Sequence, residues 1–154
     1  MKKVFLLSIF LFTSLIADKP IRVYVDVVGD LFHAGHVAFF QKAKEFGDVL
    51  IVGVHSDEDV TDYKRRPILT MEERVTSIKG CRYVDQVIEN APLPVTKELL
   101  EELEIDFVVH GDDFNPDMIH IHYGLPIEMG IFKTVPYTPG ISTTGIINRI
   151  KNRG

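Results

Sequence analysis

The sequence has no tryptophan and only one cysteine, Cys81, among its 154 residues. A single cysteine excludes a disulfide within the chain and cannot by itself make a metal site. Basic residues are also few, with 17 lysines and arginines against 22 aspartates and glutamates, which gives a formal net charge of −5. Without a basic excess or interleaved aromatic residues, we predict no nucleic-acid partner. Positive charge for a smaller anion has to come from local clusters such as residues 64–66.

The longest apolar stretch lies at the N-terminus, where two lysines precede the nearly apolar segment 4–17. A stretch of about 14 residues is short for a bilayer span, but a charged start before a short apolar run is typical of a secretory signal. Three interpretations stay open for residues 1–20: a signal or membrane tether, a misassigned start, or a folded part of the domain. We expect residues 21–154 to form one cytoplasmic domain, with any membrane contact made through residues 1–20.

Apolar runs rich in β-branched residues alternate with segments of helical periodicity along the rest of the chain. The predicted strands cover residues 23–25, 49–54, 83–88, 106–110 and 131–135, and the predicted helices cover 36–46, a short stretch after 57, 71–79, 96–104 and 142–151. Residues 114–130 show no readable pattern. This alternation predicts an α/β fold with a doubly wound, mostly parallel five-stranded sheet.

The clearest functional pattern is D-L-F-H-A-G-H, from Asp30 to His36, in the loop between the first predicted strand and helix. In such a unit, the N–H groups of the first helical turn and the helix dipole form an anion site. His33 and His36 stand at this helix start, where each imidazole can donate a hydrogen bond to a phosphate oxygen. Gly35 lets a phosphate approach the backbone. We therefore interpret the loop as a nucleoside-triphosphate site.

Two other patterns bear on the site. The fourth predicted strand ends in Gly111-Asp112-Asp113, and since open α/β sheets bind ligands beyond the carboxyl ends of their strands, this loop should face the first one. Two imidazoles, His120 and His122, would lie on one side of an extended segment at a metal-like spacing. No cysteine or close carboxylate completes that set, so we predict no metal site built by the protein.

Four motifs in order resemble the cytidylyltransferase family: D-L-F-H-A-G-H from Asp30, M-E-E-R ending at Arg74, C-R-Y-V-D from Cys81 and G-I-S-T-T from Gly140. The likeness covers residues 21–150 and is greatest to the ethanolamine-phosphate, choline-phosphate and glycerol-3-phosphate enzymes, which transfer CMP from CTP to a phosphorylated alcohol and release pyrophosphate. It implies a Rossmann-like nucleotidyltransferase fold, CTP as substrate, Mg²⁺ bound with CTP, and a homodimer. An adenylyltransferase that uses ATP, and a nucleotide-binding regulatory module without turnover, stay open as alternatives.

The resemblance also implies roles for individual residues. His33 and His36 would be catalytic, holding the triphosphate and the transition state at the α-phosphorus, and Lys64 would neutralise charge. The other residues implied in nucleotide binding are Asp30, Gly35, Arg74, Asp112, Asp113, Gly140, Ile141, Ser142 and Thr143. The family likeness implies that Arg74 contacts a phosphate and that Ser142 and Thr143 bind the β- and γ-phosphates. It also implies that Asp112 or Asp113 lies beside the cytosine and ribose.

Asp26 matches the position that faces the cationic amine in the choline and ethanolamine enzymes, although a structural cap on the loop is an alternative role. A carboxylate there favours an ammonium group over a neutral polyol. Quaternary ammonium groups are usually held by aromatic cages, and Leu93 stands where an aromatic residue often does. The resemblance thus implies phosphoethanolamine, or the phosphonate 2-aminoethylphosphonate, as acceptor. Two positions depart from the family pattern: residues 27–29 read V-V-G instead of glycine, any residue and an aromatic, and Tyr137 stands where arginine is usual.

Overall fold

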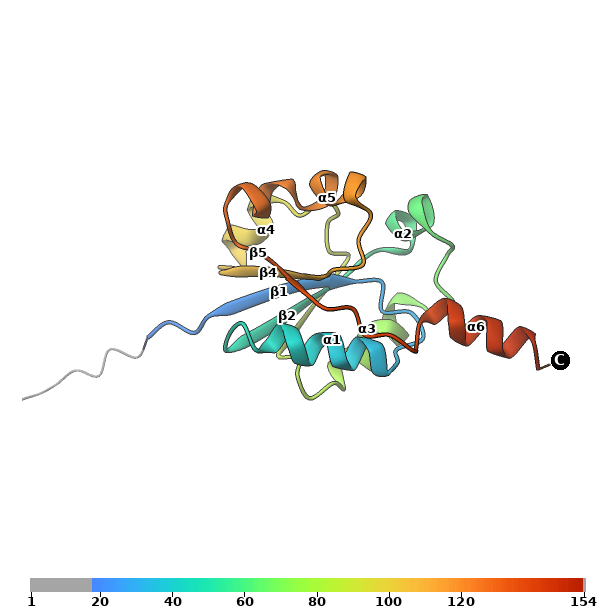
Figure 1. Ribbon diagram of the computed structural model, residues 1–154. Helices are drawn as coiled ribbons and strands as arrows, with labels where there is room; N and C mark the ends of the chain where they lie inside the picture. The colour runs from blue at the N-terminus through green and yellow to red at the C-terminus, as the bar shows by residue number, and fades with distance from the viewer. Residues whose placement is uncertain (1–17, 154) are drawn as a thin grey trace, which may run out of the picture.

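The computed structural model describes residues 18–153, which form a five-stranded parallel sheet with helices on both faces (Figure 1). The strands are β1 (Arg22–Val27), β2 (Val49–Val54), β3 (Gln86–Glu89), β4 (Phe107–Gly111) and β5 (Phe132–Val135). The helices are α1 (Ala34–Lys44), α2 (Asp57–Tyr63), α3 (Met71–Lys79), α4 (Lys97–Glu102), α5 (Pro116–Glu128) and α6 (Thr143–Lys151). The predicted fold class is confirmed. Most of the signal or tether segment predicted for residues 1–20 lies outside the described residues, and within them no helix is long and apolar enough to cross a membrane.

The strand order is β3-β2-β1-β4-β5, and every neighbouring pair is parallel. The chain runs outward from β1 through β2 to β3, then crosses back to β4 on the other side of β1. Tyr24 in β1 therefore pairs with Ile51 of β2 on one side and with Val108 of β4 on the other. The loops that follow β1 and β4 meet where the strand order reverses, which is the place where open α/β sheets bind ligands.

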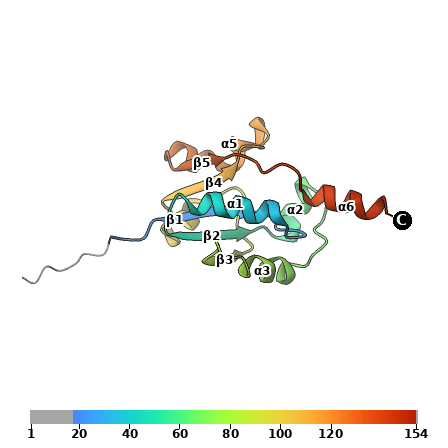
Figure 2. The same ribbon diagram turned by 60° about the horizontal axis from the view of Figure 1, so that its bottom comes forward.

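Alternate residues of the central strands enter two separate cores. On one face, Val23 and Val25 of β1 pack with buried residues of α1 and α3, such as Phe40 and Ile78. On the opposite face, Tyr24 packs with residues from α4 and α5. Figures 1 and 2 show α1 and α3 on one side of the sheet, α4 and α5 on the other, and α6 extending away from it. Because both faces are covered, the central strands read as continuous apolar runs.

Most predicted boundaries lie within two residues of those observed, and the helix at 71–79 and the strand at 49–54 are confirmed in full. The third strand was predicted too early, since β3 begins at Gln86. The N–H of Val84 donates to the carbonyl of Cys81 at 3.0 Å, which makes a turn of residues predicted to be extended. A β-branched and aromatic run can be packed in a turn as well as in a strand, because both bury its apolar side chains.

Residues 114–130, for which no element was predicted, contain α5. Asn115 caps this helix by accepting from the N–H of Asp117 at 2.9 Å. Pro126 lies inside it and cannot donate to the carbonyl of His122, which accepts instead from the N–H of Val95 at 3.0 Å. The interpretation of residues 120–122 as extended was wrong, because they are helical. Among residues 18–153, no group of three or more histidine, cysteine, aspartate or glutamate side chains could hold a metal ion.

Candidate functional site

A cavity of about 540 Å³ lies beyond the carboxyl ends of β1 and β4. Residues from four separate segments line it, within 26–39, 60–67, 110–113 and 136–144. The first and third segments are the two loops that the sequence predicted to face each other. The structure thus brings the predicted phosphate loop, the basic cluster and the start of α6 to one cavity.

His33 and His36 cap the helix whose start they occupy. The Nδ1 atom of His33 accepts from the N–H of Gly35 at 3.0 Å, and the Nδ1 atom of His36 accepts from the N–H of His33 at 3.2 Å. Burial lowers the pKa of both imidazoles, and the pKa of His36 falls to about 4. A neutral imidazole that accepts at Nδ1 carries its proton on Nε2. Both rings are therefore Nε2–H donors at neutral pH, and both line the cavity.

Gly35 lines the cavity between the two histidines. A Cβ atom at this position would lie 2.8 Å from Cε1 and 2.9 Å from Nδ1 of His33. The absent side chain therefore leaves room for the His33 ring to turn back and cap the helix. This reason for glycine was not visible in the sequence, where close approach of a phosphate was the interpretation.

Gly29 adopts a φ of +72°, a region that L-residues with side chains rarely enter. A Cβ atom there would lie 2.7 Å from Cδ1 of Ile78. The loop after β1 therefore requires glycine at position 29, where the family pattern has an aromatic residue. The glycine of this loop serves a turn packed on α3.

Asp30 connects the histidine loop to the basic segment that follows α2. Its buried carboxylate accepts from the N–H groups of Ile68 and Leu69 at 3.0 Å and pairs with Arg65 at 2.8 Å. Burial raises the pKa of Asp30, but the two backbone hydrogen bonds and Arg65 outweigh it and hold that pKa below its ordinary value. Asp30 lines the cavity, yet its carboxylate is engaged by the protein, so it fixes the conformation of the loop.

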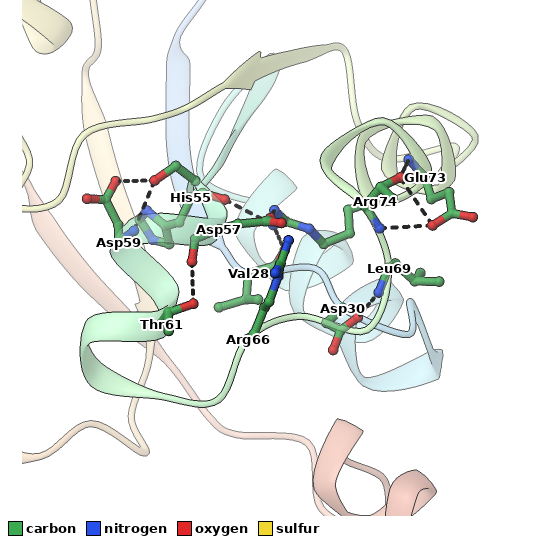
Figure 3. Close-up of polar contacts among 12 residues, drawn as sticks. Val28, Asp30, His55, Asp57, Asp59, Thr61, Arg66, Leu69, Glu73 and Arg74 are labelled. Atoms are coloured by element: carbon green, nitrogen blue, oxygen red, sulfur yellow. Dashed lines mark hydrogen bonds and ion pairs between the residues drawn. The ribbon is translucent and has the colours of Figure 1, made fainter.

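Arg74, for which the resemblance implies a phosphate contact, lies away from the cavity, and that contact stays a prediction. Arg74 is fully buried and does not line the cavity. Its guanidinium donates to the carbonyls of Val28 at 2.6 Å and His55 at 3.0 Å and pairs with Asp57 at 2.5 Å. Figure 3 shows this side chain pointing from α3 toward those three residues. Arg74 therefore joins the loops that follow β1 and β2 and supports the site from behind.

Five other predicted nucleotide-site residues line the cavity, namely Lys64, Asp113, Ile141, Ser142 and Thr143. The Ser142 hydroxyl caps α6 by accepting from the N–H of Gly145 at 3.0 Å. The Thr143 hydroxyl donates to the carbonyl of Asp30 at 2.9 Å and lies 3.5 Å from Nε2 of His33. The start of α6 is thus attached to the histidine loop.

Asp112 and Gly140, in contrast, do not line the cavity. Asp112 accepts from the N–H of Tyr137 at 2.8 Å, which fixes the turn before α6. Gly140 has a φ of +94° in that turn. The structure therefore gives both residues a role in shaping the loop, and it places the Tyr137 side chain on the cavity wall.

A second cavity of about 460 Å³ adjoins the first and shares Asp26 and Lys64 with it. Its other walls include Tyr63, His122 and Tyr123. The Tyr123 hydroxyl donates to Oδ1 of Asp26 at 2.5 Å. Burial, followed by the charge of Asp26, raises the pKa of Tyr123 well above its usual range and that of Tyr63 to about 12. Both phenols therefore stay protonated beside the carboxylate.

The residues of this second cavity that sequence reasoning missed include His55, His110 and Tyr123. His55 and His110 each stand at or just after the end of a strand that borders β1. Their positions at strand ends could have indicated from the sequence that they belong to the site. Tyr123 had no such signal, because it belongs to the helix that the sequence did not reveal.

A family model described as Cytidylyltransferase-like matches residues 29–149. The ethanolamine-phosphate cytidylyltransferase of Dictyostelium discoideum is 45% identical over 134 residues, which are 86% of this chain and 37% of that protein. The human choline-phosphate cytidylyltransferase A is 41% identical over 139 residues, again 86% of this chain and 37% of that protein. The chain thus spans less than half the length of these curated relatives.

Solved structures show the same fold. The lipopolysaccharide core biosynthesis protein of Thermoplasma volcanium has a TM-score of 0.65 and 25% identity, covering 80% of this chain and 100% of that one. The pantothenate synthetase of Thermus thermophilus has a TM-score of 0.57 and 12% identity, covering 86% of this chain and 64% of that one. At that identity the second likeness concerns the fold alone.

Proposed function

This chain belongs to the cytidylyltransferase-like family, and on that premise we propose that it transfers CMP from CTP to a small phosphorylated amine and releases pyrophosphate. The observation that carries the proposal is the pair of Nε2–H donors of His33 and His36 in a cavity that adjoins the buried carboxylate of Asp26. A phosphate site and an ammonium site lie side by side. The Dictyostelium discoideum relative, which is an ethanolamine-phosphate enzyme by name, supports the same choice.

In this reaction, a phosphate oxygen of the acceptor forms a bond to the α-phosphorus of CTP while the bond to the β-phosphate oxygen breaks. Such a transfer needs positioning and charge stabilisation and no protein nucleophile. We assign the stabilisation of charge on the α-phosphoryl oxygens to the Nε2–H groups of His33 and His36. Lys64, which lines both cavities, would supply positive charge between nucleotide and acceptor.

We place the β- and γ-phosphates at the start of α6. A helix N-terminus favours anions, and Ser142 and Thr143 both line the cavity there. The contact of Thr143 with the histidine loop would then bring the α-phosphate beside His33. Tyr137 occupies the position where the family likeness suggested arginine, and Lys64 and Arg65 are cations that line this cavity.

We expect CTP to bind together with Mg²⁺, which would offset part of the triphosphate charge. The part of the chain that the structure describes holds no cage of three ligands for an ion. Asp113 is an exposed carboxylate on the wall of both cavities, whereas that of Asp30 is occupied by Arg65 and backbone N–H groups. Mg²⁺ usually keeps most of its hydration shell. Phosphate oxygens and water, with Asp113 beside them, would therefore be suitable ligands for it.

Pyrophosphate release measured with each of the four nucleoside triphosphates, with phosphoethanolamine as acceptor, tests the proposal. We expect turnover with CTP. Preference for ATP would favour an adenylyltransferase, and CTP binding by calorimetry without turnover for any acceptor would favour a regulatory module. The homodimer and the cytoplasmic location stay predictions, and sedimentation velocity would test the first of them.

A further inference from the structure

Asp26 and His55 face each other in the second cavity without a hydrogen bond between them. The Oδ2 atom of Asp26 lies 3.7 Å from Nε2 of His55, and both residues line the cavity. Among the described residues, Oδ2 has no hydrogen-bond partner, although Oδ1 accepts from Tyr123. A buried carboxylate oxygen without a donor is costly, and this one stands at a cavity that can admit a donor.

The proton on His55 is placed by its other nitrogen. Nδ1 lies 3.3 Å from the carbonyl oxygen of Ala91. A carbonyl oxygen can only accept, so this contact is a hydrogen bond when Nδ1 carries the proton. In the neutral ring, Nε2 is then an acceptor. With the ring neutral, two acceptors, Oδ2 of Asp26 and Nε2 of His55, face each other, and a donor between them would satisfy both.

The backbone of His55 is held from two sides. Its N–H donates to the carbonyl of Val27 at 3.1 Å, and its carbonyl accepts from Arg74 at 3.0 Å. The side chains of His55 and Asp26 are only 4% and 1% exposed. A cation that reaches these two atoms leaves its water behind, so its N–H groups need protein acceptors in exchange.

We propose that His55 is a further specificity-determining residue, whose Nε2 accepts an N–H from the primary ammonium group of the acceptor while Asp26 accepts another. The inference rests on the proposed function and adds to it a second acceptor atom. A primary ammonium group has three N–H donors, enough for both atoms. A trimethylammonium group has none, so it would leave Nε2 and Oδ2 unpaired and place methyl groups against them.

The first test uses the unaltered protein and the series phosphoethanolamine, its N-methyl and N,N-dimethyl derivatives, and phosphocholine. We expect kcat/KM to fall along the series by about a hundredfold in total, with KM for CTP unchanged. Equal or better use of phosphocholine would overturn the inference while leaving cytidylyl transfer intact. If no acceptor gives pyrophosphate, the proposed function fails, and calorimetric affinity for the same four compounds then tests the inference separately.

Two variants identify His55 as the source of the selectivity. His55→Leu lacks an acceptor and should lose about tenfold or more in preference for phosphoethanolamine over phosphocholine. His55→Gln can place its amide oxygen near the position of Nε2 and should keep most of that preference. His120→Leu is the matched control, because His120 is exposed on α5 and outside the cavity, and it should behave as wild type. Thermal unfolding and CTP affinity report whether each variant is folded.

Nitrogen-15 NMR of the His55 ring supplies a readout that does not depend on the folding of any variant. We expect a proton on Nδ1 and a bare Nε2, whose chemical shift changes when phosphoethanolamine binds and changes less with phosphocholine. A proton on Nε2 in the complex would overturn the inference, as would unchanged selectivity in a folded His55→Leu protein.

Discussion

The Nδ1 atom of His36 accepts a hydrogen bond from the backbone N–H of His33, at 3.2 Å. Together with the bond from Gly35 to His33, this contact closes a capping box in which two imidazoles replace the usual hydroxyl and carboxylate. The contacts that start α1 use only Nδ1, so the Nε2–H of each ring is left to other partners, and that of His33 lies 3.5 Å from the Thr143 hydroxyl. Structure and proposed chemistry thus use opposite nitrogens of the same rings.

Separate nitrogens allow the two roles of His33 to be tested separately. His33→Asn keeps a side-chain acceptor for the helix N-terminus, whereas His33→Ala removes it. We expect both variants to lose about 10²-fold or more in kcat. Only His33→Ala should also lose about 1 kcal/mol of unfolding free energy, as measured by urea denaturation. Near-normal turnover of His33→Asn would show that Nε2 does not act in the reaction.

The buried imidazole of His36 should make stability depend on pH. Its pKa is about 4 in the folded protein, chiefly because of burial, against about 6.5 in an unfolded chain. The unfolded chain therefore binds the proton first, so this contribution is complete above pH 6.5 and is lost as pH falls toward 4. The shift corresponds to about 3 kcal/mol. Asp30, whose pKa is below 3.8, adds a loss only at lower pH.

Urea denaturation of the wild type and His36→Gln between pH 7 and pH 4 measures this effect. We expect the unfolding free energy of the variant to vary less with pH over that range than that of the wild type. If the unfolding free energies of the two proteins changed equally with pH, the His36 ring would not be desolvated, in contradiction to the structure.

A substitution of Arg74 distinguishes a structural role of its side chain from a direct contact with phosphate. Arg74→Leu would leave the carbonyls of Val28 and His55 without their donors and should cost about 3 kcal/mol or more in unfolding free energy. Asp57→Asn, at the partly exposed end of the pair, is the milder control. A stable Arg74→Leu protein with only a raised KM for CTP would restore the direct phosphate contact that the structure does not show.

Glycine-to-alanine substitutions distinguish the need for space beside the His33 ring from the general effect of alanine on helix stability. Alanine normally stabilises a helix interior relative to glycine by about 1 kcal/mol. Gly35→Ala should gain little or nothing in stability and lose turnover, because its Cβ displaces the His33 ring. Gly124→Ala in α5 meets no atom within 4 Å and should keep full activity. Equal turnover of the two variants would contradict the packing reason given for Gly35.

Local signals account for what the sequence predicted well. The side chains of Thr70 and Glu73 and their backbone N–H groups make a capping box that needs no distant partner, so the start of α3 could be predicted to the residue. The run 49–54 could be assigned to β2 because a strand buried on both faces is apolar throughout. Both signals can be read from residues that are neighbours in the chain.

Other features could not be predicted because their causes lie far away in the sequence. Tyr123 donates a hydrogen bond to Asp26, which is 97 residues away in the sequence. It belongs to a helix whose sequence pattern is obscured by an internal proline. Arg74 was correctly placed one turn into its helix, but a charged residue gives no sign of being buried until its three partners are known. The sequence therefore located the loops of the site, and the structure divided their residues between those that line the cavities and those that support them.

The central claim is the transfer of CMP from CTP to a phosphorylated amine, and mass spectrometry of the products tests it most directly. The protein is incubated with CTP, Mg²⁺ and phosphoethanolamine, and the same mixture is prepared with Asp26→Asn. We predict CDP-ethanolamine and pyrophosphate in equal amounts from the wild type, and about tenfold less from the variant. The absence of CDP-ethanolamine from a wild-type protein that binds CTP would contradict the account.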